Sequence, residues 1–491
     1  MTTANRAICN MVIATIVLVP AMMSDSPVDV GFFWHVSDLH YDKDYATNGT
    51  RDAMCHYSPN QTEHDDIGPY GDSRCDAPKL LIESAFSAMR DIQPEPDYIL
   101  WTGDNLPHLP DIPWSEVYSE TRWLGEVLSR SFPNSPIVPT LGNHDCSPPN
   151  DMRPDNMSKF LSEADFKSLL PSSAWGTFEK AGYYSWTVSG TLRLVCLNTV
   201  LWFTGNLAPV VNGSDEQLAW LHMQLQQAQE LGEKVYISGH VAPGFNTRVF
   251  ASDVAVTELF RDDINEMYQD LISNFSDTVA GQFFGHLHGN SFVLISDADG
   301  QTVNSAQVTA SVTPWTPTVR DHWSVSVPTQ PMVRLYKYDR HSARLLDYTV
   351  YYMDLDKANL RSQNHTTWGA LYTLTTQYGV PDASTASMVA IAERLRSDSL
   401  FLDMYIKLGK AFKDVVPCDS FCRRVQLCAT LAARAVYHAA CLQLDQGNES
   451  QKPRISILVA VLIGVLGLVF IGVSIVILLR YQRGRMVWSP S

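Results

Sequence analysis

The sequence predicts an α/β protein built around a parallel or mixed β-sheet. Short apolar runs that are typical of buried strands alternate with segments of helical periodicity through the first 290 residues. Several of these runs end in glycine followed by a metal-ligand side chain, Asp, Asn or His. In such folds ligands collect at the carboxyl ends of the strands, so these side chains predict a functional site at that edge.

Length and charge restrict the class of protein. The chain has 491 residues, 45% hydrophobic and 18% charged, which suits two or three globular domains. Its formal net charge of -16 argues against nucleic-acid polymers or anionic lipid surfaces as partners. A small phosphodiester substrate is still compatible with an acidic protein whose site carries its own metal ions. We expect a monomer.

Both ends of the chain have the features of sorting signals. Residues 1–24 carry Arg6 and a short apolar run, which we interpret as a signal peptide rather than an anchor. Residues 455–479 form an uncharged stretch long enough for a tilted transmembrane helix. The basic tail at 480–491 favours a retained helix over a glycolipid anchor signal, although the apolar stretch suits both, and it predicts a cytoplasmic C-terminus.

This topology predicts a single-pass type I membrane glycoprotein of the secretory pathway. Its catalytic domain would be extracellular or luminal, and we favour the cell surface over the endolysosome because no tyrosine sorting signal follows Tyr481. Glycosylation sequons occur at Asn48, Asn60, Asn156, Asn212, Asn274, Asn364 and Asn448.

The cysteines also suit an oxidising compartment. Eight remain after Cys9 leaves with the signal peptide. We expect disulfides between Cys55 and Cys75, Cys418 and Cys422, and Cys428 and Cys441, with a zinc knot as the alternative for the last four. Cys146 and Cys196 suit either a disulfide or two buried thiols.

The first half of the chain alternates strands and helices in the following order. A strand at 30–36 leads to Asp38 and His40, whose two-residue spacing on extended chain puts both side chains on one face. A polar loop at 41–76 precedes a helix at 78–90. Further segments are a strand at 97–102 ending in Gly103-Asp104, a helix at 114–132, and a strand at 135–141 ending in Gly142-Asn143-His144-Asp145.

The second half repeats the theme and then becomes helical. Strands at 183–188 and 192–197 precede a helix at 214–230. Strands at 234–238 and 279–284 end in Gly239-His240 and Gly285-His286-Leu287-His288. Later strands are predicted at 291–295, 307–312, 333–338 and 345–352, and residues 357–442 have helical patterns. We therefore divide the mature chain into a domain at 28–355 and a helical, disulfide-containing subdomain at 356–450.

The residues that end these strands predict a dinuclear metal site. Each of them alone would also suit a cap, a turn or a solvated histidine. Together they supply imidazole, carboxylate and amide ligands that zinc, manganese and iron accept. The predicted ligands are Asp38, His40, Asp104, Asn143, His240, His286 and His288.

This ordered set resembles the calcineurin-like metallophosphoesterases. Within that superfamily, the segments 34–40, 103–108 and 331–339 and the cysteine-bearing helical tail resemble the acid sphingomyelinase-like phosphodiesterases. The chain differs from acid sphingomyelinase itself in having no room for a saposin-like domain before Asp38, which weighs against extraction of lipids from membranes.

The resemblance implies a four-layer α/β/β/α sandwich and two Zn²⁺ ions per chain. It implies that Asp38, His40 and His288 bind the first ion, that Asn143, His240 and His286 bind the second, and that Asp104 bridges them. Pro107 stands where a purple acid phosphatase has its tyrosinate ligand, so a ferric-tyrosinate site is not expected.

These residues predict a metal-dependent phosphoric diester hydrolase. Two metal ions can activate a water molecule for in-line attack on phosphorus. His144, next to a ligand, would protonate the leaving oxygen, and Asp145 would orient its imidazole. The resemblance gives His108 a share in that task, although a structural role in its proline-flanked loop is equally compatible with the sequence.

Two other functions remain as alternatives to our first hypothesis, which is hydrolysis of nucleotide-type phosphodiester or pyrophosphate bonds. The first is a sphingomyelin or phospholipid head-group phosphodiesterase, in which Trp202 and Phe203 could touch acyl chains. The second, from a different class, is a catalytically idle surface receptor. All seven predicted ligands are present, which argues against the receptor.

Overall fold

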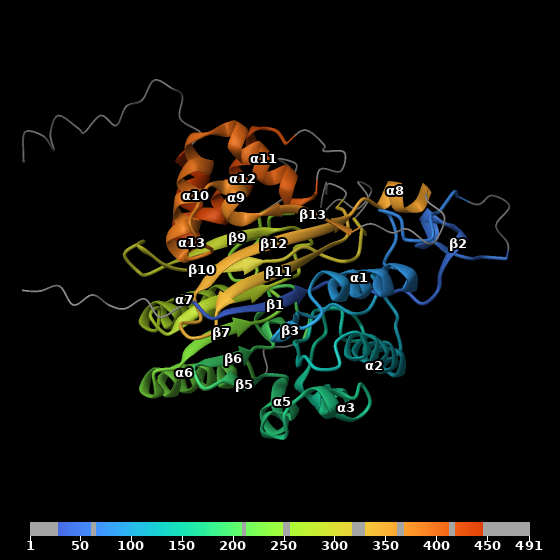
Figure 1. Cartoon of the computed structure of the whole chain (residues 1–491), viewed down its shortest axis with the longest axis horizontal. Helices are drawn as coiled ribbons and strands as arrows, with labels where there is room; N and C mark the ends of the chain where they lie inside the picture. Colours follow the sequence, from blue (N-terminus) through green and yellow to red (C-terminus); the bar gives the residue numbers. More distant parts are fainter. Residues whose placement is uncertain are drawn as a thin grey trace, which may run out of the picture.

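Two six-stranded β-sheets form the centre of the molecule (Figure 1). The structure is a computed structural model that describes residues 28–59, 65–208, 213–248, 256–316, 329–360, 368–411 and 418–444. The strand orders are β13-β12-β11-β1-β3-β4 in the first sheet and β5-β6-β7-β8-β10-β9 in the second.

Both sheets are mixed, which confirms the predicted class. The first contains β1 (Val30–Val36), β3 (Tyr98–Trp101) and β4 (Ile137–Pro139), which are parallel, and then β11 (Met332–Asp339), β12 (Leu345–Met353) and β13 (Trp368–Thr373), which are antiparallel. The second contains parallel β6 (Leu192–Cys196), β7 (Lys234–Ser238), β8 (Val279–Phe284) and β10 (Thr302–Val308), with β5 (Tyr184–Ser189) and β9 (Ser291–Ser296) antiparallel at its edges. The parallel strands of each sheet therefore end at a common edge.

The two sheets pack face to face through aromatic side chains. Phe33 of β1 stacks between Tyr98 and Tyr336 of its own sheet, with ring centroids 4.8 and 4.7 Å away. Its edge meets Phe283 of the second sheet at 5.3 Å. Phe33 is fully buried, so this contact lies in the core that holds the sheets together.

Helices lie on the outer faces of both sheets, in the layer order that we expected. Trp368 Nε1 of β13 donates to Ser84 Oγ of helix α1 (Lys79–Ile92) at 2.9 Å, and α2 (Trp114–Ser131) packs beside α1. On the other side, α6 (Gly213–Leu231) packs on β6 and β7, and α7 (Asp262–Asn274) packs on β9 and β10.

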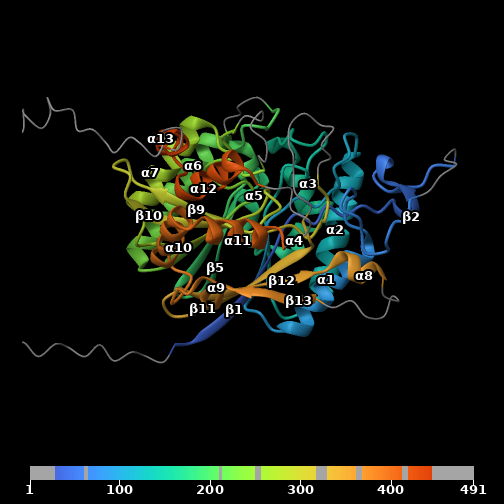
Figure 2. The same cartoon turned by 90° about the horizontal axis from the view of Figure 1, so that it is seen from above.

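Short elements account for most of the differences from the prediction. Three short helices were not predicted, because one or two turns are too short to show a periodic pattern. They are α3 (Met157–Ser162), α4 (Phe166–Leu169) and α5 (Trp175–Ala181). Strand β2 (Tyr45–Thr50) lies within the polar loop and projects from one end of the molecule (Figure 2). The strand predicted at 307–312 is wrong in its bounds, since β10 covers Thr302–Val308.

The C-terminal part is helical with one exception. It contains α8 (Leu355–Leu360), α9 (Leu374–Tyr378), α10 (Thr385–Ser397), α11 (Ser399–Gly409), α12 (Ser420–Leu431) and α13 (Ala435–Leu444). The prediction of helix was wrong for Trp368–Thr373, which forms β13 because its backbone extends the first sheet beside β12. Helix α10 packs on β9 and β10, and buried Arg434 donates to Ser296 O at 3.0 Å. Helices α10 and α12 are therefore joined to the second sheet, whereas α9 packs on β12 and β13 of the first.

Among the residues that the structure describes, none of the helices combines the length and the apolar character that crossing a membrane requires. The predicted signal peptide at 1–24, transmembrane helix at 455–479 and basic tail at 480–491 all lie outside the described residues.

Candidate metal centre

The seven predicted metal ligands lie in the loops that follow five strands. Asp38 and His40 follow β1, Asp104 follows β3, Asn143 follows β4, His240 follows β7, and His286 and His288 follow β8. All seven side chains are buried. The two facing sheets present their strand ends to one another. Residues 248 positions apart in sequence therefore meet at one place, as the 3.2 Å separation of His40 Nε2 and His288 Nε2 shows.

The backbone of these loops is held in an unusual conformation. Five ligands have positive φ, namely Asp38 (52°), His40 (41°), Asp104 (56°), His286 (68°) and His288 (54°). Residues other than glycine adopt this region infrequently, at a cost of about 1–3 kcal/mol each. Such a concentration of strain in buried loops is typical of functional sites.

The glycines beside the ligands allow two loops to touch. A Cβ atom on Gly142 would lie 2.2 Å from Asp104 Oδ1, and one on Gly285 would lie 1.9 Å from Ser37 Oγ. No side chain fits in that space, because real Cβ contacts essentially never fall below 3.0 Å. The recurring pair of glycine and ligand in the sequence therefore reflects close packing of the strand-end loops.

One group of possible ligand atoms contains Asp38, His40, Asp104 and His288. Asp104 Oδ2 lies 3.5 Å from His40 Nε2, and Asp38 Oδ1 lies 3.3 Å from His288 Nε2. These atoms converge on one point within 4.8 Å of one another, with two imidazoles and two carboxylates. This donor set fits a divalent transition metal ion.

A second group contains Asp104, His240 and His286. His240 Nε2 lies 3.1 Å from Asp104 Oδ2 and 3.1 Å from Asn143 Oδ1, so the amide oxygen faces the same point. Asp104 belongs to both groups, so the two groups share one carboxylate. The residues present therefore fit two metal ions.

Hydrogen bonds orient the imidazoles toward these points. Nδ1 of His40 lies 2.8 Å from Leu106 O, and Nδ1 of His240 lies 2.6 Å from Thr102 O. Each carbonyl accepts the Nδ1 proton and leaves Nε2 free to bind metal. Burial, and then neighbouring His108, keeps the pKa of His40 well below its ordinary range, so this imidazole is held in the neutral form that binds metal.

His240 and Asp104 shift each other's pKa in opposite directions. Burial acts to lower the pKa of His240, but Asp104 outweighs it and raises the pKa to about 9. Burial acts to raise the pKa of Asp104, yet His240 and His144 hold it well below its ordinary range. In the metal-free protein the His240 imidazole thus carries a proton, and binding of a metal ion to this imidazole would release it.

His144 lies beside both groups. Its backbone N–H donates to Asp104 Oδ1 at 2.7 Å, and its ring centroid lies 5.0 Å from that of His40. Its Nδ1 is buried without a hydrogen-bond partner in the described part of the chain. Burial, and then His108, lowers its pKa to about 3, so the ring needs a nearby anion to carry a proton.

Asp145 has different partners from the ones that we expected. Its carboxylate accepts the backbone N–H groups of Gly142, Asp104 and Asn105 at 2.6, 3.0 and 2.7 Å. These bonds tie the loop after β4 to the loop after β3. The expectation that Asp145 orients the imidazole of His144 is therefore corrected: Asp145 fixes the backbone that carries Asp104 and His144.

His108 has the orienting carboxylate that the sequence analysis missed. Its Nδ1 lies 2.9 Å from Oδ1 of buried Asp76, and its backbone N–H donates to Asp76 Oδ2 at 2.6 Å. Burial raises the pKa of Asp76 to about 7, and this effect outweighs the hydrogen bond from the backbone of His108, which lowers it. The ring of His108 lies 4.0 Å from that of His40 and 4.4 Å from that of His144, so it faces the metal centre. The sequence feature that could have pointed to Asp76 is its position directly after Cys75.

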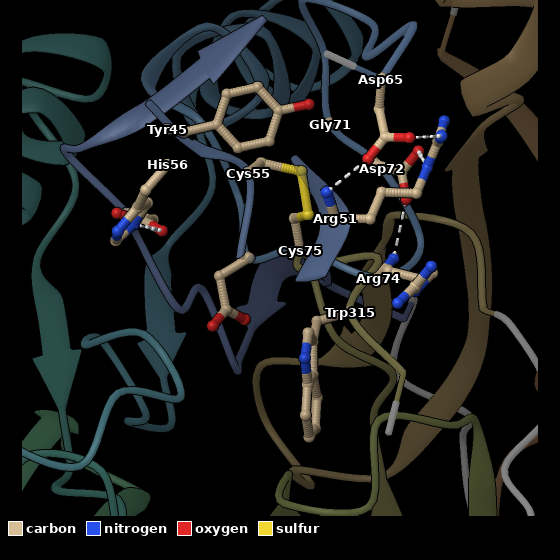
Figure 3. The surroundings of a disulfide bond; sticks show 12 residues. Tyr45, Arg51, Cys55, His56, Asp65, Gly71, Asp72, Arg74, Cys75 and Trp315 are labelled. Atoms are coloured by element: carbon tan, nitrogen blue, oxygen red, sulfur yellow. Dashed lines mark hydrogen bonds and ion pairs between the residues drawn. A yellow bond between two sulfur atoms is a disulfide. The ribbon is translucent and has the colours of Figure 1, made fainter. Parts of the chain in front are cut away.

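Trp315 forms the outer wall beside His108. The two rings stack with centroids 3.6 Å apart. Figure 3 shows Trp315 beneath the Cys55–Cys75 disulfide, and Asp76 is the residue that follows Cys75. The backbone N–H of Thr316 donates to Ser73 O at 3.0 Å, which joins this segment to the disulfide loop. The predicted polar loop at 41–76 is thus part of the site.

Two basic residues beside the centre were also missed. Nη2 of Arg248 lies 3.3 Å from His286 Nε2, and Lys410 Nζ donates to His288 O at 3.4 Å. They come from the loop after β7 and from the end of α11. Lone basic residues at such positions carry no sequence pattern that marks a site.

The disulfides have the expected pairing, Cys55–Cys75, Cys418–Cys422 and Cys428–Cys441. Cys146 and Cys196 are buried free thiols. Trp202 is fully buried and Phe203 meets the ring of His286 at 4.9 Å, so this pair does not form an exposed apolar surface. Of the sequons, Asn48 and Asn274 are exposed and Asn156 is partly exposed, while Asn60, Asn212, Asn364 and Asn448 lie outside the described residues.

Comparisons with known proteins agree with this geometry. Residues 33–290 match the calcineurin-like phosphoesterase family, and residues 301–448 match the acid sphingomyelin phosphodiesterase C-terminal region. The chain is 34% identical to acid sphingomyelinase-like phosphodiesterase 3b of Homo sapiens, over 89% of this chain and 95% of that protein. It is 32% identical to cyclic GMP-AMP phosphodiesterase SMPDL3A of Homo sapiens, over 86% and 92%. It is 26% identical to sphingomyelin phosphodiesterase A of Dictyostelium discoideum, over 81% and 66%.

Both parts of the described chain therefore have family counterparts, the sheet domain with its ligands and the helical part with its disulfides. The chain belongs to the acid sphingomyelinase-like phosphodiesterases of the calcineurin-like phosphoesterase superfamily, and it is a metal-dependent phosphodiesterase.

Proposed function

We propose that this protein is a dinuclear zinc phosphodiesterase that hydrolyses nucleotide-type phosphodiester or pyrophosphate bonds. The observation that carries the proposal is the position of Asp104, whose Oδ2 lies 3.5 Å from His40 Nε2 and 3.1 Å from His240 Nε2. Asp38, His40 and His288 would hold one ion, and Asn143, His240 and His286 the other, with Asp104 between them. When bound, two such ions supply a nucleophilic water and neutralise charge on the phosphoryl group.

The protein's own residues would move the proton to the leaving group. His144 and His108 lie next to each other beside the first group of ligands. We assign His144 as the general acid, because its Nδ1 has no partner among the described residues. This nitrogen can bind a proton when the anionic substrate lies beside it. His108, held by Asp76, would support it by polarising the same oxygen.

The nucleotide preference rests on two supports. One relative with 32% identity is named a cyclic GMP-AMP phosphodiesterase. In addition, Trp202 is fully buried, so of the aromatic pair that suggested contact with acyl chains only Phe203 is partly exposed. Lipid head-group hydrolysis is the second candidate, because one relative is named sphingomyelin phosphodiesterase A and another is named acid sphingomyelinase-like.

A substrate panel tests this proposal. The zinc-loaded full chain is assayed on nucleoside triphosphates, on cyclic dinucleotides and on sphingomyelin vesicles, with Asn143→Ala as the inactive control and zinc content measured in parallel. We expect cleavage of the nucleotides and little release of choline phosphate. Cleavage of sphingomyelin alone would establish the lipid activity, and zinc binding without turnover of any of these compounds would exclude both.

We also propose that the catalytic domain is luminal or extracellular and that residues 455–479 anchor it. Three disulfides support an oxidising compartment. Exposed Asn48 and Asn274 are open to glycosylation. Resistance of the domain to protease in intact microsomes, with sensitivity to N-glycosidase, is the expected result. Recovery of the chain in the soluble fraction after alkaline washing would exclude the anchor.

A further inference from the structure

Two cations contact the loop that carries His286 and His288. Nη2 of Arg248 lies 3.3 Å from the ring nitrogen His286 Nε2. Lys410 Nζ lies 3.4 Å from the backbone oxygen of His288 and donates to it. Both side chains are only partly exposed, and the two approach the loop from different parts of the fold.

Among the described residues, neither cation has an anionic partner. No carboxylate of the described residues forms an ion pair with Arg248 or Lys410, in contrast to Arg193, Arg340 and Arg434, which all have them. A partly buried charge without a partner is costly, and it is retained where a ligand supplies the opposite charge. The carboxylates of Asp38 and Asp104 belong to the groups of possible metal ligands instead.

The charge balance of the occupied site strengthens this argument. Two divalent ions would exceed the charge of the Asp38 and Asp104 carboxylates, and the two basic side chains would add to that excess. The scissile phosphodiester carries a single negative charge, so the site as a whole favours a substrate with further anionic groups. The side of the centre next to His286 and His288 is where such a group would be bound.

We propose that Arg248 and Lys410 form a subsite for a second phosphate group, next to the phosphodiester that is cleaved. This inference rests on the proposed phosphodiesterase function and specifies the class of substrate: compounds with two or more phosphates, such as nucleoside polyphosphates or cyclic dinucleotides. Arginine can hold a phosphate by two parallel hydrogen bonds, and lysine adds a point charge. A choline group in the same place would meet two like charges.

The position of Lys410 gives the helical C-terminal part a role in recognition. Lys410 follows the last residue of α11, and the backbone N–H of Asn290 donates to Gly409 O at 3.0 Å. Gln426 of α12 donates to the backbone oxygen of Thr247, beside Arg248. The helices therefore place one cation directly and support the loop of the other.

Two substrates with oppositely charged neighbouring groups test the subsite. The zinc-loaded full chain is assayed on a nucleoside triphosphate and on p-nitrophenyl phosphorylcholine, and the ratio of the two kcat/KM values is the readout. Arg248→Ala and Lys410→Ala should each lower this ratio about tenfold. Each substitution removes a charged hydrogen bond to the second phosphate, which only the nucleoside triphosphate has. Arg248→Lys and Lys410→Arg should retain most of it.

Lys407→Ala is the matched control, because Lys407 is an exposed lysine on the same helix α11. Its ratio should equal that of the wild type. An equal loss on both substrates, or an unchanged ratio in Arg248→Ala and Lys410→Ala, would overturn the subsite while leaving the phosphodiesterase function intact. Turnover of the choline ester alone by the wild type would overturn both the subsite and the nucleotide preference.

Binding provides a readout that needs no turnover. Calorimetric titration of the zinc-loaded chain with a nucleoside diphosphate and with phosphocholine should show tighter binding of the diphosphate, and the two alanine substitutions should reduce that difference about tenfold. If the wild type hydrolyses neither substrate, the proposed function fails, and equal affinity for the two ligands would then overturn the subsite separately.

Discussion

Nδ1 of His108 lies 2.9 Å from Oδ1 of Asp76, and this pair joins the disulfide-bonded loop to the metal centre. Asp76 directly follows Cys75, and His108 follows β3. The carboxylate also accepts the hydroxyl of Thr313 at 3.1 Å, so its orientation is set from two sides. An imidazole held in this way keeps one tautomer and presents Nε2 to the site.

Replacement of Asp76 should therefore slow the reaction without removing the metals. In Asp76→Ala we expect kcat to fall about tenfold to a hundredfold with little change in KM, since orienting partners of this kind contribute that much. Steady-state kinetics and zinc content check it. Asp72→Ala is a control from the same loop, because Asp72 pairs with Arg51 instead. Loss of zinc from the Asp76 variant would contradict the assigned role.

Asp104 is expected to be essential for holding both ions. Asp104→Asn keeps the size but loses the charge, so the two imidazoles at 3.5 and 3.1 Å no longer have a shared anion. We expect fewer than two zinc ions per chain and a loss of activity of about a hundredfold or more. Asp97→Asn, at the other end of β3, alters the ion pair with Arg340 and should keep both ions. Two ions and normal turnover in Asp104→Asn would exclude the shared ligand.

The stability of the metal-free protein should fall in acid because of His144. Its pKa in the fold is about 3, mainly through burial, against an ordinary value of 6.5. Between these values the unfolded chain binds a proton that the folded protein does not. The free energy of unfolding is therefore undiminished by His144 above pH 6.5 and decreases as the pH falls toward 3. One such group changes the free energy of unfolding by about 1.4 kcal/mol per pH unit.

Denaturant unfolding of EDTA-treated protein at pH 6.5, 5.5 and 4.5 measures this dependence. His144→Gln should have a shallower dependence than the wild type. His222, which is exposed on α6, provides the control His222→Gln. The same slope in the wild type and in His144→Gln would show that His144 takes up its proton in the folded state as readily as in the unfolded one.

The Cys55–Cys75 disulfide should matter for catalysis as well as for stability. It closes a loop of 20 residues, for which chain entropy predicts about 3 kcal/mol of stabilisation. Because Asp76 is the next residue, the double variant Cys55→Ser with Cys75→Ser should also lower kcat. The corresponding change at Cys428 and Cys441, in the helical part, should lower the melting temperature with a smaller effect on kcat. Equal effects on kcat would place the disulfide outside the site.

Patterns that repeat along the chain were predictable. The strands that carry Asp38, Asp104, Asn143, His240 and His286 are apolar runs with a clear end, and the glycines mark where two loops touch. Short helices such as α5 and strand β13 were missed, because one is too brief for a period and the other depends on pairing with β12. The transmembrane prediction at 455–479 lies outside the described residues.

The sequence by itself determined the order of most strands and helices and the candidate ligands, because these depend on local periodicity and residue chemistry. The structure decided between disulfides and a zinc knot for the last four cysteines. Only the tertiary structure decided which carboxylate forms a hydrogen bond with which histidine. Asp145 was expected to hold His144 but bonds to backbone amides, while Asp76 holds His108 from 32 residues away. Likewise Arg248 and Lys410 approach one loop from different elements. Such contacts arise when two sheets and a helical layer close on each other, and no local pattern encodes them.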